Sequence, residues 1–193
     1  MSIKKAERLL AGKEMAMRGY RTANIQTQTM LTQSQVRALM TELRDQGVDV
    51  NNRNGPAPSP AYIIRTRRAA AEGSLIVAIY LDMASQSANT QPYRSIDTKI
   101  LDAAYDAYLD YRKSMTFLQK ERPLTIDQAY KLIVSLRDRD IDYSQAAFVG
   151  KCENCRSIYL YTLKQTTTDC PICKLKDTGS SAGKNDPEQE SLL

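Results

Sequence analysis

All four cysteines of the chain lie close together near its C-terminal end, as Cys152-Glu-Asn-Cys155 and Cys170-Pro-Ile-Cys173. Two C-x-x-C pairs are typical of a four-cysteine zinc site, although the fourteen-residue spacer here is one residue shorter than the usual range. Four thiolates complete the tetrahedral shell of Zn²⁺ and leave no position for water or substrate. We therefore predict one structural zinc ion per chain, with all four cysteines as ligands.

The spacer between the two pairs predicts a small zinc ribbon. Residues 156–163 (RSIYLYTL) are rich in strand-forming side chains, and residues 165–169 (QTTTD) are typical of a turn. Metal binding contributes roughly 10 to 16 kcal/mol in isolated zinc fingers, enough to order a segment with almost no core. Two alternatives are a pair of disulfides and a C-x-x-C redox centre. The charged segment 1–12 indicates no signal peptide and a cytoplasmic location, which disfavours disulfides, and a redox pair usually accompanies a βαβ pattern.

The length of 193 residues suits one domain of about 150 residues with an appendage. We predict a mainly α-helical domain over residues 1–150, the zinc ribbon over 151–176 and a disordered tail over 177–193, which has too little apolar content to fold. The longest apolar run, residues 75–83, is too short to span a bilayer, so we expect no membrane association.

The chain contains no histidine, which excludes Ser-His and Cys-His nucleophilic pairs and every histidine metal ligand. Glycine-rich phosphate-binding motifs are also missing. We therefore predict that the protein is not an enzyme. The remaining catalytic hypothesis would use the carboxylates of Asp97, Asp102 and Asp106. These residues lie among alanines and tyrosines on a predicted helix, which indicates that the carboxylates are solvated.

Positive charge is concentrated in two parts of the chain. Residues 1–72 carry a net charge of +6 and residues 151–176 carry +3, whereas residues 73–150 carry −1 and the tail carries −3. Basic segments of this kind are expected of a protein that binds the phosphate backbone of nucleic acids. A basic surface that is only solvated would give the same distribution.

The first 45 residues predict three helices. Helical periodicity covers residues 3–20, ending near Gly19, and residues 22–28. Thr32 is suited to cap the third helix. Its apolar residues form a single stripe: Val36, Leu39, Met40 and Leu43. A short helix, a tight turn and an amphipathic helix indicate a helix-turn-helix, although two packed helices with a polar outer face fit the periodicity equally well.

In a helix-turn-helix the second helix lies in the major groove, where Gln and Arg side chains match the edges of adenine and guanine. The candidate DNA-contacting residues of this helix are Gln33, Ser34, Gln35, Arg37 and Arg44. A predicted helix over residues 61–71 places three arginines in one turn, where they contact phosphates or only face solvent: Arg65, Arg67 and Arg68. The candidate phosphate-contacting residues of the ribbon are Lys151, Arg156, Lys164, Lys174 and Lys176.

The middle of the chain predicts further helices after a proline-rich loop at residues 46–60. Gly73 is expected to interrupt the helix over 61–71, and residues 75–83 to form a buried helix at the centre of the core or at a subunit interface. A long helix is predicted over residues 96–118, followed by one that Thr125 caps.

The order of these segments resembles the FlhC family of bacterial flagellar transcriptional activators. The segments "TQSQVRALMTELRDQG" and "ILDAAYDAYLDY" are similar to segments of that family, and "CENC" with "CPIC" matches its zinc cluster in place and kind. The resemblance covers roughly residues 3–176. The short cysteine spacer and the lack of Trp are compatible with relatives carried by mobile elements, which activate conjugative-transfer genes.

The resemblance implies a DNA-binding transcriptional activator subunit that acts in a heteromeric complex with a small helical FlhD-like partner. Such a complex binds double-stranded promoter DNA and recruits RNA polymerase to flagellar or conjugative-transfer operons. The resemblance assigns the four cysteines as zinc ligands and assigns no base-contacting residue. The alternative function is an adaptor whose ribbon binds another protein without direct DNA binding.

Overall fold

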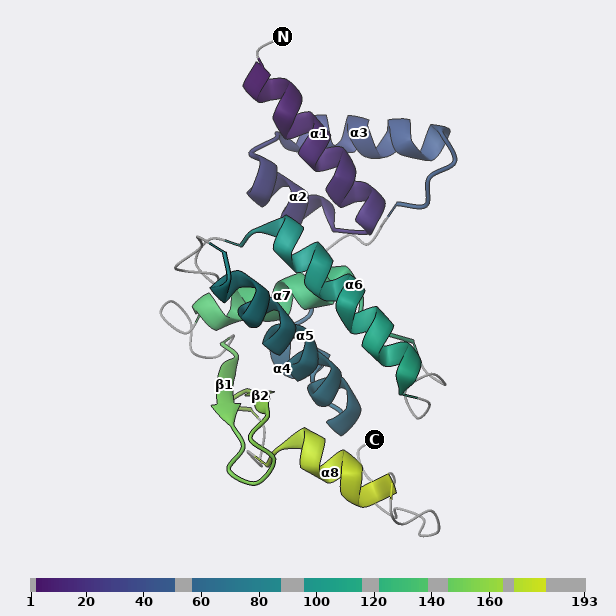
Figure 1. Ribbon diagram of the computed structural model, residues 1–193. Coiled ribbons are helices and arrows are strands. Elements are labelled where there is room, and N and C mark those ends of the chain that lie inside the picture. Colours follow the sequence, from purple (N-terminus) through teal and green to yellow (C-terminus); the bar gives the residue numbers. More distant parts are fainter. Residues whose placement is uncertain are drawn as a thin grey trace.

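Helices dominate the architecture, as predicted, and a β hairpin carries the first pair of cysteines. The computed structural model describes residues 3–50, 57–87, 96–115, 122–138, 146–164 and 169–179. Helices α1, α2 and α3 form a group at one end of the molecule, and the hairpin with α8 lies at the other end (Figure 1). No helix within these ranges combines the length and the hydropathy needed to cross a membrane.

The N-terminal group consists of α1 (Ile3–Arg18), α2 (Thr22–Thr29) and α3 (Gln33–Asp45), close to the predicted bounds. Gly19 ends α1 with a φ of +91°, a conformation that glycine adopts without strain. Thr32 caps α3 in a capping box: its hydroxyl accepts a hydrogen bond from the Gln35 amide at 3.3 Å, and the Gln35 side chain accepts one from the Thr32 amide at 2.9 Å. The predicted apolar stripe of α3 is buried.

A buried ion pair joins the N-terminal group to α7 (Ile126–Asp138). The Arg21 guanidinium pairs with Asp127, whose other carboxylate oxygen accepts hydrogen bonds from the Arg21 amide at 3.0 Å and the Asn24 side chain at 2.7 Å. Thr125 caps α7 as predicted, since its hydroxyl accepts a hydrogen bond from the Gln128 amide at 3.3 Å. A buried charge is stable only when it is paired and fully hydrogen-bonded, so this contact fixes the N-terminal group on the body.

Helix α6 (Thr98–Ser114) makes a second connection to the N-terminal group through two of the three carboxylates of the catalytic hypothesis. Asp106 accepts two hydrogen bonds from Arg18, at 2.7 and 2.6 Å. Asp102 accepts a hydrogen bond from the Tyr20 hydroxyl at 2.9 Å, and Asp97 caps α6. All three carboxylates therefore have structural partners. The helix was predicted over residues 96–118, but it begins at Thr98 and ends at Ser114, since Met115 is no longer helical; residues 116–118 lie outside the described ranges.

The prediction of one helix over residues 61–71, interrupted at Gly73, is wrong. A short helix α4 (Pro60–Ile63) ends before Ile64, and α5 (Arg67–Ser85) then runs without a break through Gly73. Thr66 caps α5, because its hydroxyl accepts a hydrogen bond from the Ala69 amide at 3.1 Å. Gly73 lies at a close contact between α5 and its neighbours, since a Cβ atom there would be 2.9 Å from Leu132 and 3.3 Å from Ile64. The glycine permits close packing and does not end the helix.

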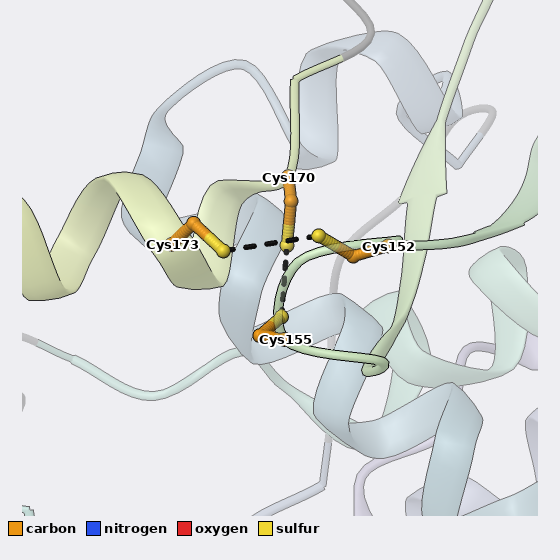
Figure 2. A group of neighbouring side chains, drawn as sticks. All are labelled: Cys152, Cys155, Cys170 and Cys173. Atoms are coloured by element: carbon orange, nitrogen blue, oxygen red, sulfur yellow. Dashed lines mark hydrogen bonds between the residues drawn. The ribbon is translucent and has the colours of Figure 1, made fainter.

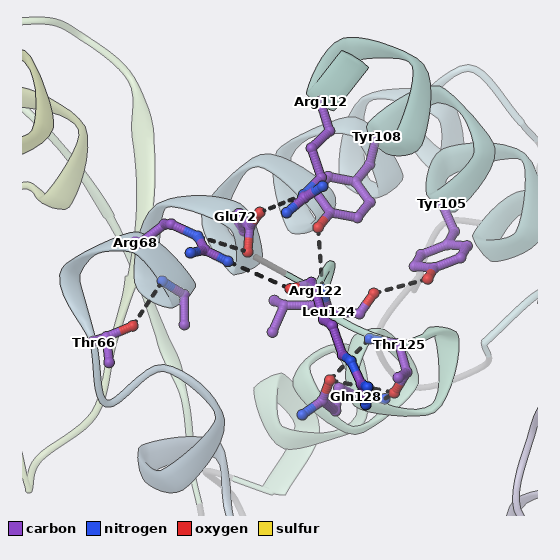
Figure 3. Close-up of polar contacts among 11 residues, drawn as sticks. Thr66, Arg68, Glu72, Tyr105, Tyr108, Arg112, Arg122, Leu124, Thr125 and Gln128 are labelled. Carbon is purple, nitrogen blue, oxygen red and sulfur yellow. Dashed lines mark hydrogen bonds and ion pairs between the residues drawn. The ribbon is translucent and has the colours of Figure 1, made fainter. Parts of the chain in front are cut away.

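Helix α5 is the centre of the core, as residues 75–83 predicted, with Ile76, Val77 and Tyr80 fully buried. One turn earlier, Glu72 is only 2% exposed and lies between two arginines (Figure 3). It pairs with Arg112 of α6 at 2.8 Å and with Arg68 at 3.8 Å. This buried cluster ties α5 to α6 in the interior of the molecule.

We expect Gly73→Val to lower the free energy of unfolding by about 1 to 3 kcal/mol, because the added methyl groups overpack the contact with Leu132. The matched control is Ala103→Val on the exposed surface of α6, which should cost about 0.5 kcal/mol or less. Urea denaturation followed by circular dichroism measures both. Equal losses for the two variants would show that the contact at Gly73 is not tight.

Candidate metal centre

The first cysteine pair lies in the turn of the β hairpin. Strand β1 (Phe148–Lys151) pairs antiparallel with β2 (Ile158–Tyr161). Cys152 follows β1 directly, its amide donates to the Ser157 carbonyl at 3.0 Å, and its carbonyl accepts from the Arg156 amide at 2.8 Å. Arg156 has a φ of +60°, an uncommon conformation for a side chain of this size. These bonds fold residues 152–155 into a tight loop whose two sulfurs converge.

The second pair lies at the start of α8 (Pro171–Gly179). Cys170 immediately precedes the helix, and Cys173 lies in its first turn. The amides of Cys173 and Ile172 hydrogen-bond the Cys170 sulfur, as unpaired N–H groups at a helix start do for an anion. The helix extends three residues beyond position 176, into the segment predicted to be disordered. The rest of that tail lies outside the described residues.

The four sulfurs converge on one point (Figure 2). The Sγ atoms of Cys152 and Cys173 are 3.8 Å apart, those of Cys155 and Cys170 are 3.7 Å apart, and all four lie within 4.8 Å of one another. Four sulfurs bound tetrahedrally at 2.3 Å from a zinc ion would be about 3.8 Å apart. The cysteines are free thiols and form no disulfide. The predicted cluster is therefore present, and its spacing fits a tetrahedral metal ion.

The surroundings of the sulfurs favour different protonation states in the metal-free protein. Hydrogen bonds from the side chain and backbone of Ser157 lower the pKa of Cys155 to about 6. A hydrogen bond with Cys155 raises the pKa of Cys173 to about 12, and burial raises the pKa of Cys170. Cys155 thus becomes a thiolate at lower pH than Cys170 and Cys173. A metal ion would have to remove the remaining protons as it binds.

A metal ion with four sulfur ligands has a structural role and not a catalytic one. The ligands fill every position of a tetrahedral shell, so no water or substrate can reach the ion. Bound metal would hold the start of α8 against the turn of the hairpin, two parts of the chain joined through residues 162–170.

The hairpin shares the main core of the protein. Leu160 is 1% exposed, and its amide donates a hydrogen bond to the buried Ser74 hydroxyl on α5 at 2.9 Å. The Leu160 side chain also lies against Gly73. The hairpin begins at Phe148, three residues before the predicted start of the ribbon. Sequence periodicity did not predict this contact between Ser74 and Leu160, because the two residues are distant in the chain and neither belongs to a recognisable motif.

The candidate DNA-contacting residues of α3 fall into two groups. Gln33, Arg37 and Arg44 are exposed, and none of their three side chains hydrogen-bonds or pairs with any residue in the described ranges. Gln35 and Ser34 are engaged at the start of the helix: Gln35 completes the capping box, and the Ser34 hydroxyl lies 3.0 Å from that of Thr32. Only part of the polar face of α3 is therefore available to contact a ligand, because the rest is occupied by the capping contacts.

The three arginines around α4 and α5 do not form one cluster. Arg65 precedes α5 and lies over the ring of Tyr62, with its guanidinium carbon 4.6 Å from the ring centroid. Arg67 is exposed at the start of the helix. Arg68 points inward to Glu72 and donates to the Arg122 carbonyl at 3.4 Å (Figure 3). Arg68 was predicted to contact phosphates or face solvent with the other two, but it lies against Glu72 instead, because this buried carboxylate requires positive partners.

The basic residues of the ribbon lie at the opposite end of the molecule from α3 (Figure 1). Lys151, Arg156 and Lys164 are exposed. Lys174 pairs with Asp169. Lys176 lies in α8, and its side chain is outside the described residues. The structure thus does not bring the two groups of candidate DNA contacts together on one local patch.

Comparison with known proteins assigns the chain to no family. No protein-family model matches it, and no curated protein is similar to it. The resemblance to the FlhC family therefore rests on the quoted sequence segments.

We expect Cys173→Ala to abolish stoichiometric metal binding, because three sulfurs cannot complete the shell. The helical signal in far-ultraviolet circular dichroism should remain, since the core around α5 and Leu160 does not include the metal. Elemental analysis and circular dichroism on the same sample measure the two effects. Ser157→Ala is the control that keeps all four ligands and should retain the metal. A metal content near one per chain in Cys173→Ala would contradict a four-sulfur site.

We expect Ser157→Ala to raise the pKa of Cys155 toward its ordinary value, because it removes the side-chain hydrogen bond that lowers it. In the metal-free protein, Cys155 should be alkylated by iodoacetamide at a rate that levels off just above pH 6. In the variant the rate should keep rising toward pH 8 to 9, the range of an ordinary thiol. Mass spectrometry of labelled peptides measures the rates. Identical pH profiles would contradict this role of Ser157.

Proposed function

We propose that the protein is a zinc-containing, DNA-binding subunit of a transcriptional activator. The observation that carries the proposal is the exposed face of α3, where Gln33 and Arg37 project from the first turns of a helix whose start is fixed by a capping box. Gln and Arg are the side chains best suited to hydrogen-bond adenine and guanine edges. A rigid helix start positions these side chains for base contacts in the major groove.

Zinc is the metal that we propose for the cysteine cluster. A tetrahedral set of four thiolates suits zinc or an iron–sulfur centre. The sulfur spacings of 3.7 and 3.8 Å match a single ion with bonds of about 2.3 Å. The zinc ion would help to keep the ribbon folded, and protein side chains would make all the contacts with DNA.

The basic residues outside α3 would contact phosphates. Arg44, Arg67, Lys151, Arg156 and Lys164 are exposed and available for this role. Their contacts would position the protein without reading sequence. Because α3 and the ribbon lie at opposite ends, a single duplex would have to follow the length of the molecule to reach both.

The proposed partner is a small helical subunit like FlhD, with RNA polymerase as the target of activation at flagellar or conjugative-transfer operons. A stripe on the outer side of α1 supports a helical partner: Ile3, Leu10 and Met17 are 79%, 59% and 48% exposed. A spacing of seven residues aligns these side chains along one face of the helix, as in a coiled-coil seam.

A protein-binding adaptor is the second candidate function. It is favoured by exposed apolar side chains on the hairpin, since Val149 and Leu163 both face solvent. In this case the ribbon would bind another protein, and duplex DNA would bind weakly or not at all.

Affinity for duplex DNA should fall steeply as the salt concentration is raised. A plot of the logarithm of the binding constant against the logarithm of the salt concentration should have a slope of about −0.9 for each phosphate neutralised. Fluorescence anisotropy with a DNA duplex selected from a random pool, using protein co-purified with its partner, measures the slope. Absence of duplex binding at low salt would favour the adaptor.

Arg37→Ala should reduce affinity for the selected duplex by about 1 to 3 kcal/mol and relax specificity at one base pair. Lys164→Ala should weaken binding to all sequences alike and make the salt slope shallower by about one. The matched control is Arg8→Ala on the exposed part of α1. If Arg37→Ala and Lys164→Ala lose affinity equally for selected and random duplexes, α3 does not read bases.

A further inference from the structure

Two sulfur contacts in the cysteine cluster connect the turn of the hairpin to the start of α8, and we call this connection the sulfur joint (Figure 2). The Sγ atoms of Cys152 and Cys173 are 3.8 Å apart. Those of Cys155 and Cys170 are 3.7 Å apart. In each contact one cysteine belongs to the first C-x-x-C pair and the other to the second. The four sulfurs therefore include two neighbouring pairs that both cross the joint.

Each of these two pairs is close to the separation that a disulfide requires. A disulfide bond is about 2.0 Å long, so the sulfurs of each pair have to approach by roughly 1.7 to 1.8 Å. A movement of this size is within the reach of the side-chain torsion angles of two cysteines. Closing both pairs would shorten the sulfur joint and leave the helices of the core where they are.

The sulfur joint is accessible to a small oxidant. Cys152, Cys155 and Cys173 are partly exposed, whereas Cys170 is buried, so each pair has at least one cysteine that solvent reaches. A solvent-accessible cysteine next to a second cysteine is the arrangement in which an oxidised thiol is converted to a disulfide. The sequence contains four cysteines, all of them in the joint. Two disulfides within one chain would therefore use every thiol of the sequence.

The two parts that meet at the sulfur joint are also held by contacts that contain no cysteine. The Leu160 amide donates to the Ser74 hydroxyl and fixes the hairpin on α5. Helix α8 contacts α5 as well. The hairpin and α8 can therefore stay beside each other while the bonds among the four sulfurs change.

We propose that the sulfur joint is a redox-sensitive site, in which a hydroperoxide converts the four thiolates to two disulfides, Cys152–Cys173 and Cys155–Cys170. A bound metal ion and the two disulfides are then alternative ways of holding the start of α8 beside the hairpin turn. Disulfides in a reducing compartment are usually transient and redox-sensing, which is the role assigned to these two. This redox role goes beyond the proposed function and does not depend on DNA binding.

The reaction is balanced with hydrogen peroxide as the oxidant. One thiolate of each pair attacks a peroxide oxygen, the O–O bond breaks, and hydroxide leaves, which gives a sulfenic acid. The second thiolate attacks this sulfur, an S–S bond forms, and the S–O bond breaks with loss of another hydroxide. For the two pairs together, two peroxide molecules are reduced and four hydroxides take protons from solvent to become water. The disulfide sulfurs no longer bind a metal ion, since thiolates are the ligands.

The test treats the full, reduced, zinc-loaded chain with two equivalents of hydrogen peroxide, blocks the remaining thiols and digests the protein with trypsin without reduction. Cleavage after lysine and arginine places the first cysteine pair in peptide 152–156 and the second pair in peptide 165–174. Mass spectrometry should find these two peptides covalently joined, and fragmentation should assign the two proposed pairings. The free-thiol count should fall from four to zero in step with zinc release to a chromogenic chelator.

Hydrogen exchange of the α8 amides measures whether the disulfides replace the metal in holding the joint. The amides should be equally protected in the reduced, zinc-loaded protein and in the oxidised, zinc-free protein. They should exchange faster in reduced protein from which a chelator has removed the zinc. Faster exchange in the oxidised protein as well would show that the disulfides do not hold α8.

Two double variants test each pairing by itself. Cys152→Ser combined with Cys173→Ser leaves only Cys155 and Cys170, and Cys155→Ser combined with Cys170→Ser leaves only Cys152 and Cys173. Each variant should form one disulfide that joins the two tryptic peptides. Circular dichroism should show an unchanged helical signal in both, because the core around α5 contains neither pair.

Joined peptides, loss of four thiols together with zinc, and recovery of both after treatment with dithiothreitol and zinc support the proposal. Disulfides confined within each peptide, disulfides between chains, unchanged thiols, or oxidation only to sulfinic and sulfonic acids would overturn it. If the reduced protein contains no zinc, the proposed metal is wrong, and the peptide result alone decides whether the disulfides form. Absence of duplex binding would refute the DNA-binding function without altering any of these measurements.

Discussion

Helix α5 and strand β2 meet at Gly73 and Ser74, and the position of the cysteine cluster depends on this contact. The Ser74 hydroxyl accepts the amide hydrogen of Leu160, and the absence of a side chain at Gly73 lets the Leu160 and Leu132 side chains approach the helix backbone. The hairpin is thus fixed on the core independently of any metal. Helix α8 also contacts α5, and the sulfur ligands join its start to the turn of the hairpin.

Buried charges determine how the parts of the protein are oriented. Glu72 ties α5 to α6 through Arg112, and Arg21 ties the N-terminal group to α7 through Asp127. Removing one member of such a pair leaves an uncompensated charge in the interior, which is strongly destabilising. These contacts therefore hold α3 and the ribbon at fixed positions relative to each other. That fixed separation is the geometry that any DNA target would have to match.

Sequence patterns predicted the local features and missed those that depend on distant contacts. The capping signals at Thr32 and Thr125, the apolar stripe of α3 and the convergence of the four cysteines could all be predicted, because each depends on residues close in the chain or on one strong motif. Gly73 was misinterpreted, since a glycine in a helical pattern indicates either a break or a close contact. Arg68 was grouped with Arg65 and Arg67 because the sequence alone does not show that Glu72 is buried and needs positive partners.

We propose that the four cysteines form a closed zinc site that holds the start of α8 beside the turn of the hairpin. The most direct test is the metal content of freshly purified, reduced protein, measured by inductively coupled plasma mass spectrometry together with a count of free thiols. The account predicts one zinc ion per chain, with four cysteines that become reactive to thiol reagents only after a chelator removes the metal. Protein that is folded, contains no stoichiometric zinc and has four freely reactive thiols would contradict it.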